Sequence, residues 1–477
     1  MAARATHAVV LGGGLAGTLA AAALAGHADH ITLVERDRMP AGPQERTGVP
    51  QARHAHMLMS SGAEAIDALV PGVTKSLYAA GAHRVSVRKG LVSSTAQGWV
   101  PRSADLQYVI TCGRALLDWT VRERVLMDPR VTLLQGTDVT GLDGDSRRVT
   151  AVRVRDRATG EASLIGADLV VDATGRGSAA RTWLEELGIP RVREETVDTG
   201  LAYSTRLFRV PPGAERDFPA VTVMPSPADP VPGRSGTLLP IEDGRWLVTL
   251  TGLRPAQPPT DDAGFLPFAR TLRTPVIGDL IEAAQPLGPV CGSRSTANRR
   301  RYYEELSLWP DGFVALGDAL AAFNPVYGHG MSVAAKAATA LRTDLERYGY
   351  LPERSRHVQR AVAATVNDAW ALAVGQDVQY PDVIGPRPGA AAKLMRRYSA
   401  RAARASATRP AVAAAIADIF TLSAPVSRLL APRAVLGALR GPGAPPLTAP
   451  PFTERERALF SRDPREPARK TEQDTTQ

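Results

Sequence analysis

Three glycines and one glutamate near the start of the chain are the first residues whose types and spacing suggest chemistry. Gly12, Gly14 and Gly17 form a G-x-G-x-x-G pattern, and Glu35 closes the next apolar run. In such a pattern the first glycine allows a tight turn, the second lets a pyrophosphate approach the backbone, and the third lets a helix pack on a strand. A carboxylate at the position of Glu35 binds ribose hydroxyls. The spacing therefore predicts a dinucleotide site.

The elements around these residues have the order that such a site needs. An apolar run at 8–11 predicts a strand, the alanine-rich stretch 18–25 a helix, and the apolar run 31–34 a second strand. The helix N-terminus then offers free N–H groups and a positive dipole end to phosphates. A loop that is glycine-rich by chance would lack this strand–turn–helix context, so we favour the binding site.

Two later apolar runs also end in glycine turns. Residues 167–173 run into TGRGS, and residues 312–317 run directly into Asp318. Pro325, Gly328 and Gly330 then break the chain before an expected helix at 331–348. Such buried runs, together with the first, predict a parallel sheet built around a dinucleotide. Asp318 is expected either to cap the following helix or to bind the cofactor.

A basic loop lies between the first motif and the following helical pattern. It carries Arg46, Arg53, His54 and His56, and the pattern turns helical from residue 57. The loop is either a solvated surface segment or one that faces the cofactor. Further on, we expect strands at 85–92, 98–100, 131–134, 137–142, 149–155 and 161–165, and a helix at 112–126 that contains Arg114.

The middle of the chain predicts a second domain. Short runs of alternating polarity at 200–210, 220–224, 236–240, 245–251 and 290–299 indicate an antiparallel sheet with one buried face, accompanied by helices at 261–272 and 275–284. The C-terminal part predicts helices at 355–374, 389–405 and 411–430 and a short helix after the proline-rich passage 442–451. We therefore divide the chain into 1–185 (dinucleotide domain, with inserted segments near 75–110), 186–300 (β-sheet domain), 301–350 (dinucleotide domain resumed), 351–461 (helical region) and 462–477, a charged tail that we expect to be disordered.

Composition excludes several functions. The net charge of +9 is carried almost wholly by arginine, but no basic helix or aromatic ladder suggests nucleic-acid binding. Cys112 and Cys291 form no C-x-x-C pair, so neither a metal site nor dithiol chemistry is expected. The apolar start lacks the features of a signal peptide, and the run 16–25 is too short to span a bilayer. These features predict a cytoplasmic protein with no stable membrane insertion; the oligomeric state is not indicated.

Three motifs carry a family resemblance. GGGLAG with Glu35, ADLVVDATG, and GDALAAFNPVYGHGM together resemble flavin-dependent monooxygenases of the aromatic-hydroxylase type (group A) over roughly residues 7–350. In combination with RTGVPQARHAHML and ATGRGS, they resemble more narrowly the epoxidases of polyether antibiotic biosynthesis, a branch related to squalene epoxidase. The resemblance implies an α/β fold: a Rossmann-like FAD-binding domain, an interleaved antiparallel β-sheet substrate domain and a helical C-terminal region.

The resemblance also implies roles for individual residues. Gly12, Gly14 and Gly17 would hold the FAD pyrophosphate, and Glu35 the adenosine ribose. The backbone N–H groups of Gly328 to Met331 would contact the pyrimidine edge of the flavin. No catalytic side chain is certain because the chemistry is centred on the flavin; the candidates near the ring are Arg53, His54, His56 and Pro325. The full set of implied cofactor-binding residues is Gly12, Gly14, Leu15, Ala16, Gly17, Glu35, Arg36, Arg46, Arg53, Arg114, Val139, Asp318, Pro325, Gly328, Gly330 and Met331.

The reaction implied is epoxidation of alkenes in a linear polyene polyketide by a flavin hydroperoxide formed from reduced FAD and molecular oxygen. The polyene, free or attached to an acidic carrier protein, would lie in an apolar tunnel. Wall residues chosen by alternation are Tyr203, Thr205, Leu207, Val221, Val223, Leu239 and Phe323.

Other activities stay open at this point. The Asp-Gly motif usual in the hydroxylases is replaced by Asp172, Ala173, Thr174 and Gly175. The electron donor is therefore either NAD(P)H or a separate flavin reductase. The alternatives are an aromatic hydroxylase of another secondary metabolite and a flavin-binding protein without turnover. A halogenase would carry Trp-x-Trp-x-Ile-Pro, which is absent from the sequence.

Overall fold

The computed structural model describes residues 5–460 except 216, 230, 232, 295 and 388. The predicted disordered tail at 462–477 lies outside the described residues. In the described part, none of the helices combines the length and the apolar character needed to cross a lipid bilayer.

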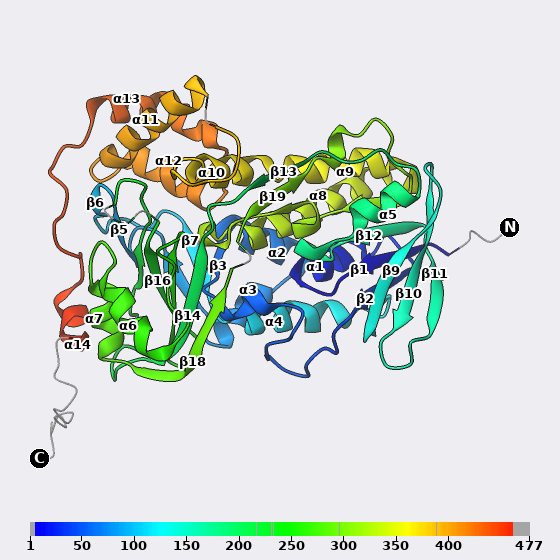
Figure 1. The fold of residues 1–477 in the computed structure, drawn as a ribbon, viewed down its shortest axis with the longest axis horizontal. Coiled ribbons are helices and arrows are strands. Elements are labelled where there is room, and N and C mark those ends of the chain that lie inside the picture. Colours follow the sequence, from blue (N-terminus) through cyan, green and yellow to red (C-terminus); the bar gives the residue numbers. More distant parts are fainter. Residues whose placement is uncertain are drawn as a thin grey trace, which may run out of the picture.

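The core of the α/β fold is a parallel sheet in the order β20-β12-β1-β2-β8. Its strands are β1 (His7–Leu11), β2 (His30–Glu35), β8 (Val131–Gln135), β12 (Leu169–Asp172) and β20 (Phe313–Ala315). The central strands are buried, which is why they read as continuous apolar runs. Helix α1 (Leu15–Leu24) contacts both α4 (Arg114–Leu126) and α8 (Gly330–Tyr348), and α9 (Ser355–Ala364) contacts β20 (Figure 1).

A larger, mostly antiparallel sheet stands beside this core (Figure 1). Its order is β18-β14-β17-β16-β15-β5-β6, and α6 (Asp262–Arg270) and α7 (Val276–Glu282) contact it. The strands are β5 (Leu91–Thr95), β6 (Gly98–Trp99), β14 (Ala202–Arg209), β15 (Ala220–Val223), β16 (Ser235–Ile241), β17 (Arg245–Gly252) and β18 (Gln285–Ser293). Strand β5 pairs in parallel with β15, so residues 91–99 belong to the same sheet as the middle of the chain.

The remaining strands of the described residues form three smaller sheets. The first is β3 (Met57–Met59), β7 (Tyr108–Thr111) and β4 (His83–Ser86); the second is β9 (Thr137–Gly144), β10 (Val149–Asp156) and β11 (Ala162–Gly166). The third is β13 (Glu194–Val197), β19 (Asn298–Arg301) and β21 (Ala321–Ala322).

The remaining elements are helical. They are α2 (Ser60–Leu69), α3 (Val73–Ala79), α5 (Ala180–Glu186), α10 (Asn367–Asp377), α11 (Ala390–Ala405), α12 (Pro410–Phe420), α13 (Pro432–Arg440) and α14 (Glu454–Phe460). The short 3₁₀ turns are η1 (Pro50–Arg53), η2 (Gly175–Gly177), η3 (Tyr303–Glu305), η4 (Gly317–Ala319), η5 (Pro325–Tyr327), η6 (Pro352–Arg354) and η7 (Val426–Leu430).

Several expected boundaries are wrong, and pairing between distant segments explains them. Residues 57–59 form a strand because they pair with β7, so the expected helix begins only at Ser60. The expected strand 85–92 is two strands because Gly90 N–H bonds to the Ser86 carbonyl in a turn. The expected strand 290–299 is divided between β18 and β19, which belong to different sheets. Likewise, α9 and α10 divide the expected helix 355–374, and α12 ends at Phe420.

Candidate functional site

The turn between β1 and α1 tolerates no side chain at two of its glycines. Gly12 has a φ of +92°, and a Cβ there would lie 2.7 Å from the Ala173 carbonyl oxygen. A Cβ at Gly17 would lie 1.8 Å from the Gly12 carbonyl oxygen, so the helix could not pack on the strand. At Gly14 the only atom within 4 Å of a Cβ is Nη2 of Arg46, at 3.8 Å. Gly14 also begins α1 without a side-chain cap, which leaves its N-terminal N–H groups available to an anion.

Glu35 and Arg46 join this turn to the basic loop. The Glu35 carboxylate accepts hydrogen bonds from the Gly13 N–H (2.8 Å) and the Asp37 N–H (2.9 Å). Arg46 lies 3.0 Å from Glu35 Oε2 and donates to the Gly13 carbonyl at 3.0 Å. The Arg46 guanidinium therefore stands over the backbone where a pyrophosphate would approach, with its charge partly balanced by Glu35. These residues fit the pyrophosphate and ribose of FAD.

Four further residues of the expected cofactor-binding set lie at different depths around this turn. Arg36 is exposed and lines a surface pocket of about 280 Å³ with Arg38 and Arg157. Val139 is half-buried on β9, a strand that contacts β2. Leu15 is buried in the first turn of α1, and Ala16 there contacts Gly317, since a Cβ on Gly317 would lie 2.8 Å from the Ala16 Cβ. This last contact brings the first and the last glycine turns together.

Asp318 stands between the two turns and is surrounded by arginines. Burial raises the pKa of its carboxyl, while the positive charges of Arg176, Arg114 and Arg299 act against that rise. A Cβ on Gly330 would lie 3.9 Å from Asp318 Oδ1, so the carboxylate faces the start of α8. Neither η4 nor α8 has a side-chain cap, so Asp318 does not act as a helix cap. The position suits hydrogen bonding to a ribityl hydroxyl or to a phosphate-bound water.

The segment before α8 has the geometry expected of a flavin-edge loop. The Asn324 side chain caps η5 by accepting from the Val326 N–H at 3.2 Å, and Pro325 is the first residue of η5. Gly328 has a φ of +69°, and a Cβ there would lie 3.0 Å from the Met59 Cε. Gly330 and Met331 then open α8 without a side-chain cap. An uncapped N-terminus stabilises negative charge, as develops on the pyrimidine edge of a reduced flavin.

Two histidines of the basic loop are held neutral, and His54 faces the large sheet. His54 Nδ1 is 2.8 Å from Thr205 Oγ1, and the Ala55 N–H donates to Thr249 Oγ1 at 2.9 Å. Burial and the charge of Arg53 lower the pKa of His54 to about 4. Burial and the charge of Arg114 lower the pKa of His56 to about 3. At neutral pH each ring therefore offers one donor and one acceptor and no charge.

Arg53 does not join this cluster, contrary to expectation. Its side chain is 55% exposed and bonds to Glu45 at 2.8 Å. The ion pair with Glu45 holds the guanidinium at the surface of this structure, turned away from the Thr205 and Thr249 hydroxyls that bind the rest of the loop.

The expected wall residues divide between the two faces of the large sheet. Tyr203, Thr205, Leu207 and Leu239 lie on the face turned toward the histidine loop: Thr205 bonds to His54, and Leu239 packs in a cluster with Met59. Hydroxyls on this face bond across strands, with Thr205 Oγ1 2.7 Å from Thr249 Oγ1 and Ser93 Oγ 2.8 Å from Thr222 Oγ1. The face is therefore part apolar and part hydroxylated rather than the wholly apolar wall expected.

Three of the expected wall residues do not lie on this face: Val221, Val223 and Phe323. Val221 pairs with Leu238, and the strand's two-residue period places both valines in the core that α6 and α7 cover, behind the sheet. Phe323 packs against Trp370 of α10, with ring centroids 6.4 Å apart, in the core of the first domain.

The sequence reasoning missed a buried carboxylate that holds the flavin-edge loop. Asp377, 2% exposed at the end of α10, accepts hydrogen bonds from Asn298 (2.5 Å), Asn324 (3.3 Å) and the Tyr327 hydroxyl. Tyr203 on the large sheet donates to Asn324 at 3.0 Å. Burial raises the pKa of Asp377, and its three hydrogen-bond donors oppose the rise. The sequence feature that could have indicated Asp377 is its position as a lone acid in the buried face of α10, which also contains Ala369, Trp370 and Ala373.

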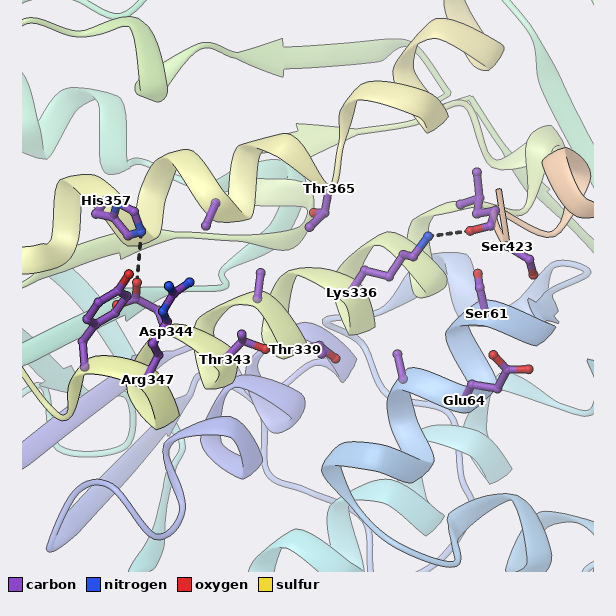
Figure 2. Close-up of a pocket in the computed structure, with 15 residues that line it drawn as sticks. Ser61, Glu64, Lys336, Thr339, Thr343, Asp344, Arg347, His357, Thr365 and Ser423 are labelled. Atoms are coloured by element: carbon purple, nitrogen blue, oxygen red, sulfur yellow. Dashed lines mark hydrogen bonds and ion pairs between the residues drawn. The ribbon is translucent and has the colours of Figure 1, made fainter. Parts of the chain in front are cut away.

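Figure 2 shows a separate groove of about 700 Å³ between α2, α8 and α9. Lys336 crosses it to donate to the Leu422 carbonyl, and His357 Nε2 lies 3.3 Å from Asp344 Oδ1. None of the glycine-turn residues lines this groove. We therefore place the cofactor at the carboxyl edge of the parallel sheet, where ligands bind in open α/β sheets.

Comparison with known proteins concerns the family and the fold. Residues 8–184 match the family model described as FAD dependent oxidoreductase. The chain is 34% identical over 390 residues to Protein Rv3254 of Mycobacterium tuberculosis (strain ATCC 25618 / H37Rv), covering 78% of this chain and 80% of that protein.

Among solved structures, the fold is similar to that of CmlS, a flavin-dependent halogenase. The TM-score is 0.61 at 17% identity, over 85% of this chain and 72% of that one. It is also similar to pqsL, a probable FAD-dependent monooxygenase from Pseudomonas aeruginosa. Here the TM-score is 0.56 at 19% identity, over 78% of this chain and 98% of that one. At these identities the likeness concerns the fold.

Proposed function

We propose that this chain, which belongs to the FAD-dependent oxidoreductases and is a family relative of Protein Rv3254 of Mycobacterium tuberculosis, is an FAD-dependent monooxygenase. In this proposal it epoxidises alkenes of a linear polyene polyketide in polyether antibiotic biosynthesis. Molecular oxygen is the second substrate, and NAD(P)H or a separate flavin reductase supplies the electrons. The finer part of this proposal rests on the motif resemblance and on the arrangement of the site.

The observation that carries the proposal is the direct bonding between the large sheet and the two loops at the cofactor site. His54 bonds to Thr205, and Tyr203 bonds to Asn324, immediately before the flavin-edge loop. A molecule lying on this face of the sheet is therefore adjacent to both loops. That is the arrangement an oxygen transfer requires, since the reacting atoms must be held within van der Waals reach.

When bound and reduced, FAD supplies an electrophilic oxygen atom derived from molecular oxygen. The chain's own contribution is position and electrostatics. The uncapped start of α8 stabilises negative charge at the flavin edge, and Arg46 does so at the pyrophosphate. Neutral His54 and His56 add no charge beside the substrate. Oxygen transfer to an alkene needs no side-chain nucleophile.

The substrate-facing surface suits a long molecule with both hydrocarbon and oxygen-bearing parts. Leu207, Leu239 and Leu247 stand opposite one another on adjacent strands, and Thr205, Thr249 and Thr237 form the next row. Of these six residues, Leu207 and Thr237 are half-buried and the other four are buried. In this proposal Leu207 contacts hydrocarbon, and Thr237 offers a hydrogen bond to a ketide oxygen. The same threonine row also favours a second candidate, hydroxylation of a phenolic substrate, because a phenol needs a hydrogen-bonding partner.

The decisive experiment is an oxygenation assay on the purified FAD-loaded protein. The protein is incubated with a reductant, air and a linear polyene ester, and products are analysed by mass spectrometry. Epoxidation gives products heavier by one oxygen atom per alkene. Oxygen incorporated only into a phenolic substrate would move the assignment to a hydroxylase. Oxygen consumption that no substrate stimulates, with no oxygenated product, would contradict monooxygenase activity altogether.

A further inference from the structure

The C-terminal helical lobe holds the whole excess positive charge of the protein. Residues 385–453 contain ten Lys and Arg residues and a single acid, Asp418, which gives this segment +9. The full chain also carries +9, so the remaining residues are balanced. Lys393, Arg396 and Arg397 on α11 and Arg433 and Arg440 on α13 are all exposed. Helices α11 and α13 contact each other at an outer corner of the molecule (Figure 1).

Large apolar side chains are exposed among these cations. Leu394 on α11 is 69% exposed, Leu430 beside α13 is 52%, and Leu436 and Leu439 on α13 are 49% and 58%. Scattered single leucines on a surface need no explanation, but these four lie on adjacent elements of one lobe.

Helix α13 buries its small residues and exposes its large apolar ones. Its small residues Ala434, Gly437 and Ala438 are buried in the lobe, while its leucines face outward. A surface helix of a globular protein ordinarily turns its leucines toward the core. Here Arg433 and Arg440 lie on the same outward side as Leu436. The helix therefore presents an apolar strip edged by arginines.

The orientation of α13 is fixed, so the leucines cannot turn inward. A Cβ on Gly437 would lie 2.7 Å from the Val412 side chain, which shows how closely α13 lies against α12. Arg401 donates to the carbonyl oxygens of Ala438 and Leu439, and Arg409 donates to that of Gly441 at 2.9 Å. These bonds hold the C-terminal end of the helix in place, and only a partner outside the lobe can bury the leucines.

We propose that this lobe binds the surface of an anionic lipid bilayer. The leucines of α13 and Leu394 enter the boundary between headgroups and acyl chains, and the surrounding arginines and Lys393 contact lipid phosphates. Leucines and basic residues on an amphipathic helix are the combination that interfacial binding uses. The charge complementarity selects anionic over neutral lipid. The attachment is peripheral, since none of the described helices can cross a bilayer.

The lobe also contacts the edge of the large sheet. Strand β6 bridges to Leu447 through Trp99, and Arg88 donates to the Ser406 carbonyl in the lobe at 3.1 Å. The lipid proposal itself rests on the lobe alone and does not depend on the reaction.

The test is flotation of the full-length FAD-loaded protein with two kinds of vesicle: pure phosphatidylcholine, and phosphatidylcholine with about one third phosphatidylglycerol. We expect binding to the anionic vesicles only, and weaker binding as salt is raised. Replacing both cations in R433Q/R440Q should lower the partition coefficient roughly 30-fold, about fivefold for each charge. The double variant L436S/L439S should lower it by at least about tenfold while leaving the charge unchanged.

Matched controls lie on the β9–β11 sheet, away from the lobe. L164S replaces a leucine that is 61% exposed, and R147Q/R155Q removes two exposed arginines. Both should bind vesicles like the unchanged protein, and unaltered flavin content reports intact folding. Absence of binding to anionic vesicles, or equal binding by L436S/L439S, would overturn the proposal. The main alternative is that the surface binds a second copy of the chain, and light scattering tests it. A dimer that dissociates in L436S/L439S, together with no binding to vesicles, would support this alternative.

Discussion

The replacement Gly14→Ala should separate cofactor binding from folding. In the structure Gly14 has φ −73° and ψ 179°, a conformation that alanine adopts without strain. The new Cβ would meet only the flexible end of Arg46, at 3.8 Å. Alanine is a slightly poorer helix cap than glycine, but it restricts the unfolded chain, and the two effects nearly cancel. We expect the FAD-free protein to change in stability by less than about 0.5 kcal/mol.

The same methyl group would stand where we expect the pyrophosphate to approach the backbone. We therefore expect the FAD dissociation constant of Gly14→Ala to rise at least tenfold, about 1.4 kcal/mol. Gly17→Ala should behave differently, because its Cβ would lie 1.8 Å from the Gly12 carbonyl oxygen. The helix must shift to relieve this contact, which costs roughly 1–3 kcal/mol or more in the FAD-free protein as well.

The two properties are measured separately. FAD affinity comes from titration of flavin fluorescence, and stability comes from urea unfolding of FAD-free protein. Gly166→Ala is the control, since a Cβ there meets nothing within 4 Å on β11. Native FAD affinity in Gly14→Ala would refute the placement of the pyrophosphate. Unfolding of Gly14→Ala as severe as that of Gly17→Ala would refute the account of the glycine turn.

Three further outcomes are expected. Asp377→Asn turns an amide N–H₂ toward the donors Asn298 and Asn324, so the free energy of unfolding should fall by about 1–3 kcal/mol and FAD should dissociate faster. An unchanged FAD release rate, measured by stopped flow, would show that Asp377 does not position the loop. Arg46→Gln should weaken FAD binding and flatten its dependence on salt; equal salt slopes in the variant and the parent protein would place Arg46 away from the phosphates. His329 is the buried residue just before α8, and its Nε2 lies 3.3 Å from the Phe420 carbonyl oxygen. Burial lowers the pKa of both His54 and His329 to about 4, against about 6.5 when unfolded, so their contribution to stability is complete above about pH 6.5 and is lost as pH falls toward 4, up to about 3 kcal/mol each. A flat urea midpoint between pH 7 and pH 5 would contradict this.

The glycines that local spacing identified have the backbone geometry that their turns need. Gly12 and Gly17 are excluded from carrying side chains by the backbone around them, and Gly328 needs its positive φ. These constraints act over a few residues along the chain, so they are visible in the sequence. The prediction of wall residues from alternation was partly wrong. A two-residue period defines the two faces of a strand, but it does not indicate which face meets the cofactor. Val221 and Val223 lie on the other face.

Long-range contacts decided what spacing alone did not indicate. Arg53 has the same sequence context as His54, yet an ion pair with Glu45 holds it in solvent while Thr205 holds His54 inside. Asp377 reaches the flavin-edge loop from a helix that lies some 50 residues further along the chain. Nothing in its own neighbourhood specifies those partners, because they are supplied by other elements after the chain has folded.

Taken by itself, the order of residues determined that this protein has a dinucleotide turn, a parallel sheet and an acid beside a second glycine turn. Each of these follows from backbone sterics and hydrophobic period, which operate within a single element or between neighbours. Tertiary structure alone decided which face of the large sheet meets the histidines, and it turned the leucines of α13 outward. Those outcomes depend on how whole elements pack, since close contact of Gly437 with Val412 leaves only one side of that helix free.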